Sequence, residues 1–199
     1  MGKGPRYRVA FRRRRTNQTD YHARKSMVLS TKLRLVIRFS LRHIQAQLVD
    51  ATKVGDVTLA AAHSKEVEKA GWKGSLKNTS AAYLTGLLIG KKALALGIET
   101  AILDLGLKRP TAGAKVFAVL KGANDAGLRI PHSGRVLPKE DRIHGLHVVT
   151  YAKEQLDGET LRYNGLFTQY LRRSLKPEHL DQHFDDVKKN ILHMVEVEK

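Results

Sequence analysis

Two pairs of histidines have the spacing of zinc ligands on a helix. His144 and His147 lie three residues apart, and His179 and His183 lie four apart. Neither pair brings a third ligand or the glutamate of the HExxH motif, whose helical spacing places two imidazoles on one metal ion. The chain contains no cysteine, which excludes disulfides, thiol catalysis and cysteine-bound zinc. We therefore expect surface histidines, no metal site and no cofactor.

Asp104 offers the strongest case for an enzyme. It lies near the end of an apolar stretch, residues 100–105, which we interpret as a buried strand. Nucleases of the ribonuclease-H type hold two metal ions in such a sheet, and the ions need several carboxylates close together. The first predicted strand carries Arg34 and Arg38 where a second carboxylate is needed, and their charge opposes Mg²⁺ binding. A metal-dependent nuclease is therefore the weaker alternative, and we expect no catalytic residue.

Binding of a polyanion is the chemistry that the basic residues support best. The net charge is +17 and the pI is about 10.2, and such an excess is normally matched by an acidic partner. The first 25 residues hold nine Lys or Arg against one acid, Asp20, and residues 12–15 are four consecutive arginines. The residues before Tyr21 lack a core pattern, so this arm should gain structure only on its partner. Nucleic acid is the expected partner.

A membrane is the other anionic partner that we considered. The arm has neither a basic amphipathic helix with bulky apolar residues nor a lipidation signal. The chain has no apolar run of about 18 residues and no signal-peptide pattern. We therefore expect a cytoplasmic protein with no membrane partner and no small-molecule substrate.

The elements that must position the basic residues indicate an α/β fold. A short helix is predicted over 21–29, and alternating apolar residues predict strands over 33–40, 43–50 and 57–63 in a three-stranded antiparallel meander. A helix over 78–96, the strand over 100–105 and a helix over 111–126 follow, which implies a mixed sheet with packed helices in a ribonuclease-H-like layout. Gly86 and Gly90 in the first long helix predict close approach by another backbone, either the sheet or RNA.

One face of the predicted meander is basic, and one loop beyond it holds the only tryptophan. That face would carry Arg34, Arg38, Gln45, Gln47 and Thr58, and it is either an RNA-binding surface or an ordinary solvent face. Trp72 lies between two glycines with Lys73 and Lys77 nearby. It would either stack on an exposed base or pack against the core.

The C-terminal part has a different composition. After a loop that begins near residue 131, we predict a short helix over 145–156 and an irregular stretch containing Tyr163, Phe167 and Tyr170. A last amphipathic helix follows Pro177, with apolar residues at helical spacing: Leu180, Phe184, Val187, Ile191 and Val195. We divide the chain into a basic extension (1–28), a globular α/β RNA-binding domain (29–131) and a loop with a helical extension (132–199).

Six segments in order resemble the large-subunit ribosomal protein L-eighteen family, which binds 5S rRNA, in its archaeal and eukaryotic form. They are RYRVAFRRRRTNQTDYHAR (6–24), RLVIRFS (34–40), GDVTLAAAHS (55–64), AAYLTGLLIGKKA (81–93), AILDLGL (101–107) and FAVLKGANDAGLRIPHS (117–133). The tail past Ala152 resembles the family only loosely and has the archaeal length. At position 41 this chain has leucine where the family commonly has asparagine, which questions the geometry of that turn.

The resemblance implies a non-catalytic component of the large ribosomal subunit. Such a protein binds 5S rRNA, touches 23S rRNA and helps attach the 5S particle at the central protuberance, beside the ribosomal protein L-five family and other protuberance proteins. In the family the arm and the meander face contact RNA, which points here to residues 12–15, Tyr21, Arg24, Arg34, Arg38 and His43. Together with the other basic and loop residues, the candidate rRNA-binding set is Arg6, Arg8, Arg12, Arg13, Arg14, Arg15, Tyr21, Arg24, Lys25, Arg34, Arg38, Arg42, His43, Trp72, Lys73 and Lys77. A free-standing structured-RNA-binding protein is the main alternative.

Overall fold

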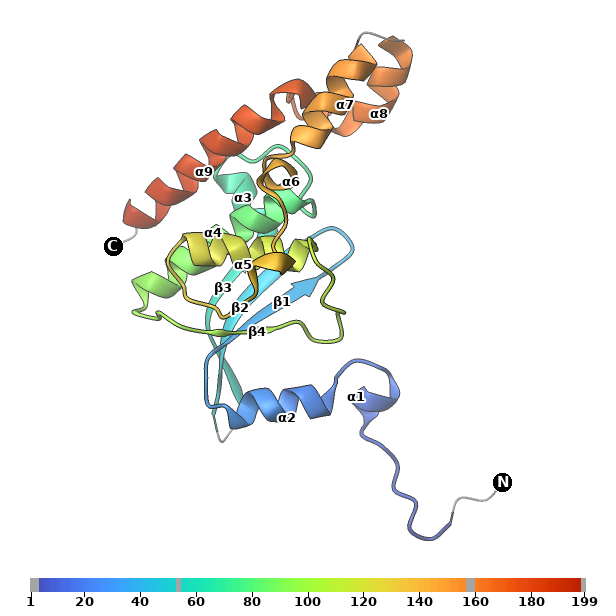
Figure 1. Cartoon of the computed structure of the whole chain (residues 1–199), viewed down its shortest axis with the longest axis vertical. Helices are drawn as coiled ribbons and strands as arrows, with labels where there is room; N and C mark the ends of the chain where they lie inside the picture. Colours follow the sequence, from blue (N-terminus) through green and yellow to red (C-terminus); the bar gives the residue numbers. More distant parts are fainter. Residues whose placement is uncertain (1–3, 53–54, 157–159, 198–199) are drawn as a thin grey trace.

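The computed structural model describes residues 4–52, 55–156 and 160–197. Figure 1 shows a small sheet with helices α4 (Thr79–Ala95) and α5 (Lys115–Asp125) packed on it. The N-terminal helices α1 (Arg12–Arg15) and α2 (Tyr21–Leu29) lie at one end of the molecule, and the C-terminal helices lie at the other. Residues 1–3 of the predicted arm lie outside the described residues.

The sheet has four strands in the order β3-β2-β1-β4. Strands β1 (Arg34–Phe39), β2 (Ile44–Ala51) and β3 (Asp56–His63) form the predicted antiparallel meander. Strand β4 (Ile102–Asp104) pairs with β1 in parallel, with Val36 opposite Asp104. The prediction of a mixed sheet is confirmed, although the last strand is shorter than expected. This pairing brings the end of β4 beside the two arginines of β1.

The turn between β1 and β2 closes without an asparagine at position 41. The Ser40 backbone N–H donates to the His43 carbonyl at 2.9 Å, and the Ser40 hydroxyl accepts from the His43 N–H at 2.9 Å. Leu41 has no positive φ, so the conformational ease of asparagine is not needed there. The Leu41 side chain is 87% exposed at the tip of the hairpin.

Helices α4 and α5 meet through glycines. The N-cap Asn78 accepts from the Ala81 N–H at 2.7 Å, as its position before the helix predicts. A Cβ added at Gly86 would lie 2.0 Å from the Val119 carbonyl oxygen, and one at Gly90 would lie 2.8 Å from the Ala123 carbonyl oxygen. The predicted close approach is therefore confirmed, but the neighbour is helix α5 and neither the sheet nor RNA.

Helices also cover the C-terminal third. The helices after the loop are α6 (Glu140–His144), α7 (Leu146–Leu156), α8 (Thr160–Arg172) and α9 (Leu180–Val197), with short 3₁₀ turns η1 (Gly134–Val136) and η2 (Pro177–His179). The predicted irregular stretch is wrong where the structure describes it. Tyr163 and Phe167 lie one helical turn apart in α8 and pack with Ala152 of α7. Residues 157–159 of that stretch lie outside the described residues.

The last helix packs on the main core as its amphipathic pattern predicts. Leu180, Phe184, Val187 and Ile191 are buried in the same cluster as α4 and the sheet. The Val195 side chain lies outside the described part. The remaining short helix, α3 (Ser64–Lys69), leads into the loop that holds Trp72.

Candidate nucleic-acid interface

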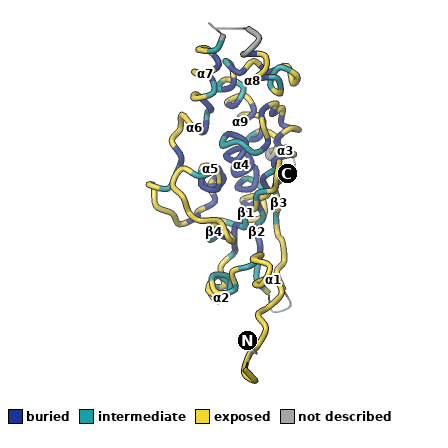
Figure 2. Tube along the Cα trace, turned by 90° about the vertical axis from the view of Figure 1, so that its right-hand side faces the viewer, coloured by how far each residue is buried: buried dark blue, intermediate teal, exposed yellow. Residues whose placement is uncertain are grey.

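The arm presents its arginines to solvent. Residues 6–15 are all exposed, and the four arginines of α1 include no buried side chain, as Figure 2 shows along the chain. The Arg13 Nε donates to the Thr19 hydroxyl at 2.8 Å, and the rings of Phe11 and Tyr21 lie 5.1 Å apart. Contacts at Arg13 and Phe11 thus hold the arm near its junction with α2, and its exposed arginines are available to an anion.

Helix α2 attaches the arm to the sheet. Its N-cap, Asp20, accepts from the His22 and Ala23 N–H groups at 2.9 and 3.2 Å. From the helix, Arg24 forms an ion pair with Asp56 at the start of β3, at 2.9 Å. Lys25 is exposed. Of the two basic residues predicted here, one is paired within the protein and one is open to solvent.

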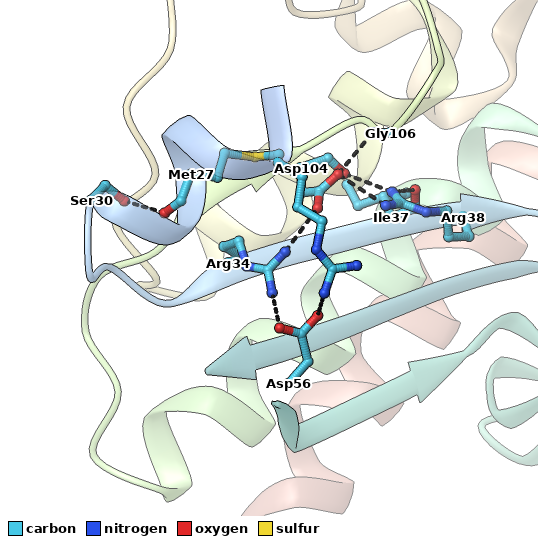
Figure 3. A network of polar contacts seen from close by, with 9 residues as sticks. Met27, Ser30, Arg34, Ile37, Arg38, Asp56, Asp104 and Gly106 are labelled. Atoms are coloured by element: carbon cyan, nitrogen blue, oxygen red, sulfur yellow. Dashed lines mark hydrogen bonds and ion pairs between the residues drawn. The ribbon is translucent and has the colours of Figure 1, made fainter. Parts of the chain in front are cut away.

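Arg34 is buried, which corrects the prediction that it lies on an exposed basic face. It is 2% exposed and lies between two carboxylates (Figure 3). Its Nη1 is 3.5 Å from Asp104 Oδ2 and its Nη2 is 2.8 Å from Asp56 Oδ1. The contact with Asp56 is an ion pair whose geometry does not meet the angles of a hydrogen bond. The Arg34 Nε has no hydrogen-bond partner among the described residues. This guanidinium is therefore engaged by carboxylates of the protein itself.

Arg38 is shared between the protein and solvent. Its Nη2 forms an ion pair with Asp104 Oδ1 at 2.9 Å, while 46% of its side chain remains exposed. The Gly106 N–H also donates to Asp104 Oδ1, at 2.8 Å, so Asp104 is fully engaged. Asp104 thus pairs with Arg34 and Arg38, the two arginines that the sequence places on the first strand. Among the described residues, no group of three or more His, Cys, Asp or Glu side chains could hold a metal ion.

A cleft of about 480 Å³ separates the arm and α2 from the open face of the sheet. We call it the arm cleft. Its lining includes five cations, Arg13, Arg24, Arg34, Arg38 and Lys108, and three acids, Asp20, Asp56 and Asp104. Asp20 caps α2, and Asp56 and Asp104 form ion pairs with the arginines of β1 and α2. The positive charges of this lining that have no acidic partner are therefore those of Arg13 and Lys108. The cation surplus therefore belongs to the rim of the cleft and to the arm beyond it.

Four other predicted residues gather at the opposite end of β1. Arg42 and His43 of the hairpin face Lys73 and Lys77 of the loop after α3, across a groove of about 800 Å³. We call it the hairpin-end groove. The Lys77 ammonium donates to the Leu41 carbonyl at 3.1 Å and so joins the loop to the hairpin. His43 is half-buried, with its ring 4.9 Å from that of His63.

The sequence analysis missed several residues that line this groove, including two cations and a tyrosine. Lys115, Tyr170 and Arg173 come from the start of α5, from α8 and from the turn after it. They are isolated in sequence, and the basic pair at 172–173 is the only local signal that could have indicated one of them. The Arg173 Nη1 donates to the Gly74 carbonyl at 2.9 Å, which fixes the C-terminal part against the loop.

Trp72 is part of the core, so the alternative of an exposed stacking ring is wrong. It is 1% exposed, its Nε1 donates to the Ser75 carbonyl at 3.2 Å, and its ring stacks on His183 with centroids 5.3 Å apart. His183 Nε2 accepts the Lys73 N–H at 3.1 Å. Burial lowers the pKa of His183, and the nearby Lys73 lowers this pKa further against a smaller opposing effect of Asp186. The neutral imidazole thus holds the loop in place.

The other histidines of the two predicted pairs are at least partly exposed. The His144 Nδ1 lies 3.6 Å from an Asp185 carboxylate oxygen. Burial, and to a smaller extent the charge of Arg142, lower the pKa of His147.

No helix in the described part of the chain is long and apolar enough to cross a membrane.

Comparison with known proteins gives a family match and close relatives. The model of a family described as ribosomal large subunit proteins 60S L5 and 50S L18 matches residues 5–99 and 97–133. The large ribosomal subunit protein uL18 of Methanothermobacter thermautotrophicus is 54% identical over 191 residues, covering 96% of this chain and 98% of the relative. The protein of the same name from Caldivirga maquilingensis is 49% identical over 193 residues, covering 96% and 93%.

Proposed function

Because the chain belongs to the family of ribosomal large subunit proteins 60S L5 and 50S L18, we propose that it binds 5S rRNA, contacts 23S rRNA and helps attach the 5S particle at the central protuberance. It is a non-enzymatic component of the large subunit of the cytoplasmic ribosome. Within that subunit its protein neighbours are members of the L-five family and other protuberance proteins.

The exposed arginine arm is the observation that carries this proposal. Six arginines at positions 6, 8 and 12–15 are exposed and none forms an ion pair within the described residues. Cations that neutralise phosphates release counterions, which supplies most of the affinity for a polyanion. The arm is joined to a rigid sheet through α2 and the Arg24–Asp56 ion pair, so its charges approach RNA from a defined side.

The roles within the candidate set follow from their positions. Arg6, Arg8, the α1 arginines and Lys25 bind phosphates, Arg38 binds with its exposed part, and Arg34 holds the platform. Selectivity among RNAs comes from the fit of folded RNA to this platform, because side chains cannot read the deep and narrow major groove of A-form RNA. The division at residues 28/29 and 131/132 remains a prediction.

The test is the salt dependence of RNA binding with and without the arm. The full chain and a chain lacking residues 1–18 are titrated with 5S rRNA at several salt concentrations. The deletion ends at residue 18 because Asp20 caps α2. If six arginines each neutralise one phosphate, the arm contributes a slope of log K against log salt of about −4 to −5. Circular dichroism should show an unchanged fold, since the α1 residues bury no side chain.

A charge-preserving variant is the matched control. Lysine at positions 12–15 keeps the four charges, so its slope should match that of the parent chain. An affinity for 5S rRNA that is nearly independent of salt would overturn the electrostatic account. Equal affinity for 5S rRNA and for transfer RNA at the same salt would instead favour a free-standing, general RNA-binding protein.

A further inference from the structure

The hairpin-end groove is a built concave surface that the arm does not reach. It lies between the β1–β2 turn, the loop over 72–78, the start of α5 and the end of α8, and its volume is about 800 Å³. None of its lining residues also lines the arm cleft. The groove is lined by the β1–β2 turn, which follows the last residue of β1, whereas helix α2 leads into the first residue of that strand and lies at the other end of the sheet (Figure 1).

The charge of the groove is strongly positive. Its lining contains Arg42, Lys73, Lys77, Lys115 and Arg173 and a single acid, Glu68. Arg173 lies 3.6 Å from that carboxylate, so this pair is internally compensated. Arg42, Lys73 and Lys115 are exposed and form no ion pair in the part of the chain that the structure describes. Three cations therefore converge on the groove without a counter-charge.

The uncharged part of the lining suits a nucleotide. Ser75 and Gln169 offer a hydroxyl and an amide group that can pair with base edges, and the half-buried ring of Tyr170 lies beside them. A basic groove with an aromatic side chain is the usual arrangement for unpaired RNA, because phosphates follow the charges while bases stack. The apolar lining is limited to Leu41 and Leu76, and Leu76 is only 8% exposed. An acidic peptide would find few anchors here, because binding to proteins depends on buried apolar or aromatic contacts.

We propose that the hairpin-end groove binds an unpaired segment of ribosomal RNA, separate from the segment that the arm binds. This proposal rests on the proposed function and adds a second contact, to which residues beyond the family match at 5–133 contribute. Tyr170 and Arg173 form one wall, so the C-terminal helices take part in RNA binding. The protein thereby holds two RNA segments at a distance set by β1.

The experiment compares two variants of equal charge in the full chain. The groove variant is Arg42→Gln/Lys73→Gln/Lys115→Gln, and the control is Lys153→Gln/Lys176→Gln/Lys189→Gln, whose lysines are exposed and outside both clefts. Both are measured against 5S rRNA, 23S rRNA and an unstructured RNA 12-mer at several salt concentrations. Hydroxyl-radical footprints are recorded on both ribosomal RNAs. Thermal unfolding confirms that the variants are folded.

We expect the groove variant to lose one protected RNA segment and to keep the segment protected by the arm. Loss of three phosphate contacts should reduce the salt slope by about 2, since each contact on a single strand contributes about 0.7. When salt decreases from 1 M to 0.1 M, the affinity of the parent should therefore increase about 100-fold more than the affinity of the groove variant. The control should keep both protected segments.

Identical footprints and slopes for the two variants would overturn the groove proposal and leave the arm proposal intact. Loss of a ribosomal protein contact with unchanged RNA footprints would also overturn it, because the groove would then be a protein-binding surface. If the parent chain protects neither ribosomal RNA, the proposed function itself fails.

Discussion

Substitution of Asp104 by asparagine should destabilise the protein far more than loss of an exposed carboxylate. The Asp104 side chain is 6% exposed and forms ion pairs with Arg34 and Arg38. Asparagine keeps the shape but removes the charge. Arg34, whose side chain is 3% exposed, then keeps only Asp56, which is 33% exposed. An uncompensated buried charge costs about 3 to 5 kcal/mol, and the surviving partner places this case near 3 kcal/mol.

Urea unfolding measures this difference. With a denaturant slope of about 2 kcal/mol per molar urea, the midpoint should fall by about 1.5 M. The transition is followed by circular dichroism and by the emission of Trp72, because both report the same core. The control is Glu140→Gln, since this carboxylate, which pairs with Lys121, is 61% exposed against 6% for Asp104. An exposed pair contributes about 0 to 1 kcal/mol.

Two outcomes would refute this reasoning. Equal midpoints for the Asp104 and Glu140 variants would mean that Asp104 does not compensate the buried arginine. Loss of 5S rRNA binding by the Asp104→Asn variant at a temperature where it is fully folded would mean that the carboxylate acts at the RNA. We expect undiminished binding, because Arg38 is released toward solvent when its partner loses charge.

Three further predictions concern the core and the loop. Gly86→Ala should destabilise the protein by about 1 to 3 kcal/mol, because the added Cβ overpacks against α5. Gly165→Ala should stabilise it by about 0.4 to 1 kcal/mol, because an added Cβ at that position meets nothing within 4 Å. The urea midpoint should therefore fall for the first variant and rise for the second. The lowered pKa of His183 means that the unfolded chain binds the proton more readily, so this contribution to stability is present above about pH 6.5 and is lost as pH falls below it. His183→Gln should therefore flatten the decrease in thermal midpoint between pH 7.5 and pH 5, and an unchanged pH dependence would contradict the role of the imidazole at Lys73. Trp72 should be blue-shifted and protected from iodide in the native protein, and strong quenching would place its ring outside the core.

Much of the fold follows from local patterns. The alternation over 33–40 and 43–50 places the correct residues in the core, because a strand has a strict period of two. Asn78 predicts the start of α4, since its side chain is a strong N-cap. The spacing of Gly86 and Gly90 predicts a close backbone contact, but the glycines carry no information on which backbone approaches. Tyr163 and Phe167 also have helical spacing, but Asn164 and Gly165 between them have low helix propensity and argue locally against a helix.

The errors in the site have one physical origin. The alternation correctly assigns Arg34 to the open side of the sheet, yet its burial depends on Asp104, which lies 70 positions later, and on α2 across that face. Trp72 is a loop residue by composition, and its burial depends on His183 of α9. In both cases the deciding partner is distant in sequence. The local sequence pattern predicts on which face of a strand or loop a side chain lies. Whether that side chain is exposed depends on which distant segments of the chain pack against the same face.

The different fates of the arginines explain how a strongly basic chain can form a stable platform for RNA. Arg24, Arg34 and Arg38 are adjacent to Asp56 and Asp104 in space, so their charge is compensated inside the protein and holds α2 and β4 to the meander. The arginines at positions 6, 8 and 12–15 form no ion pair among the described residues, so their charge remains available to the RNA that the proposed function calls for. Because counterion release scales with uncompensated cations, the internal acids decide which arginines contribute to affinity. Removal of Asp56 by an asparagine substitution should therefore weaken the attachment of α2 and increase the salt slope of RNA binding, as Arg24 becomes an additional phosphate ligand. A slope that does not change, measured with the variant still folded, would mean that Arg24 remains out of reach of the RNA.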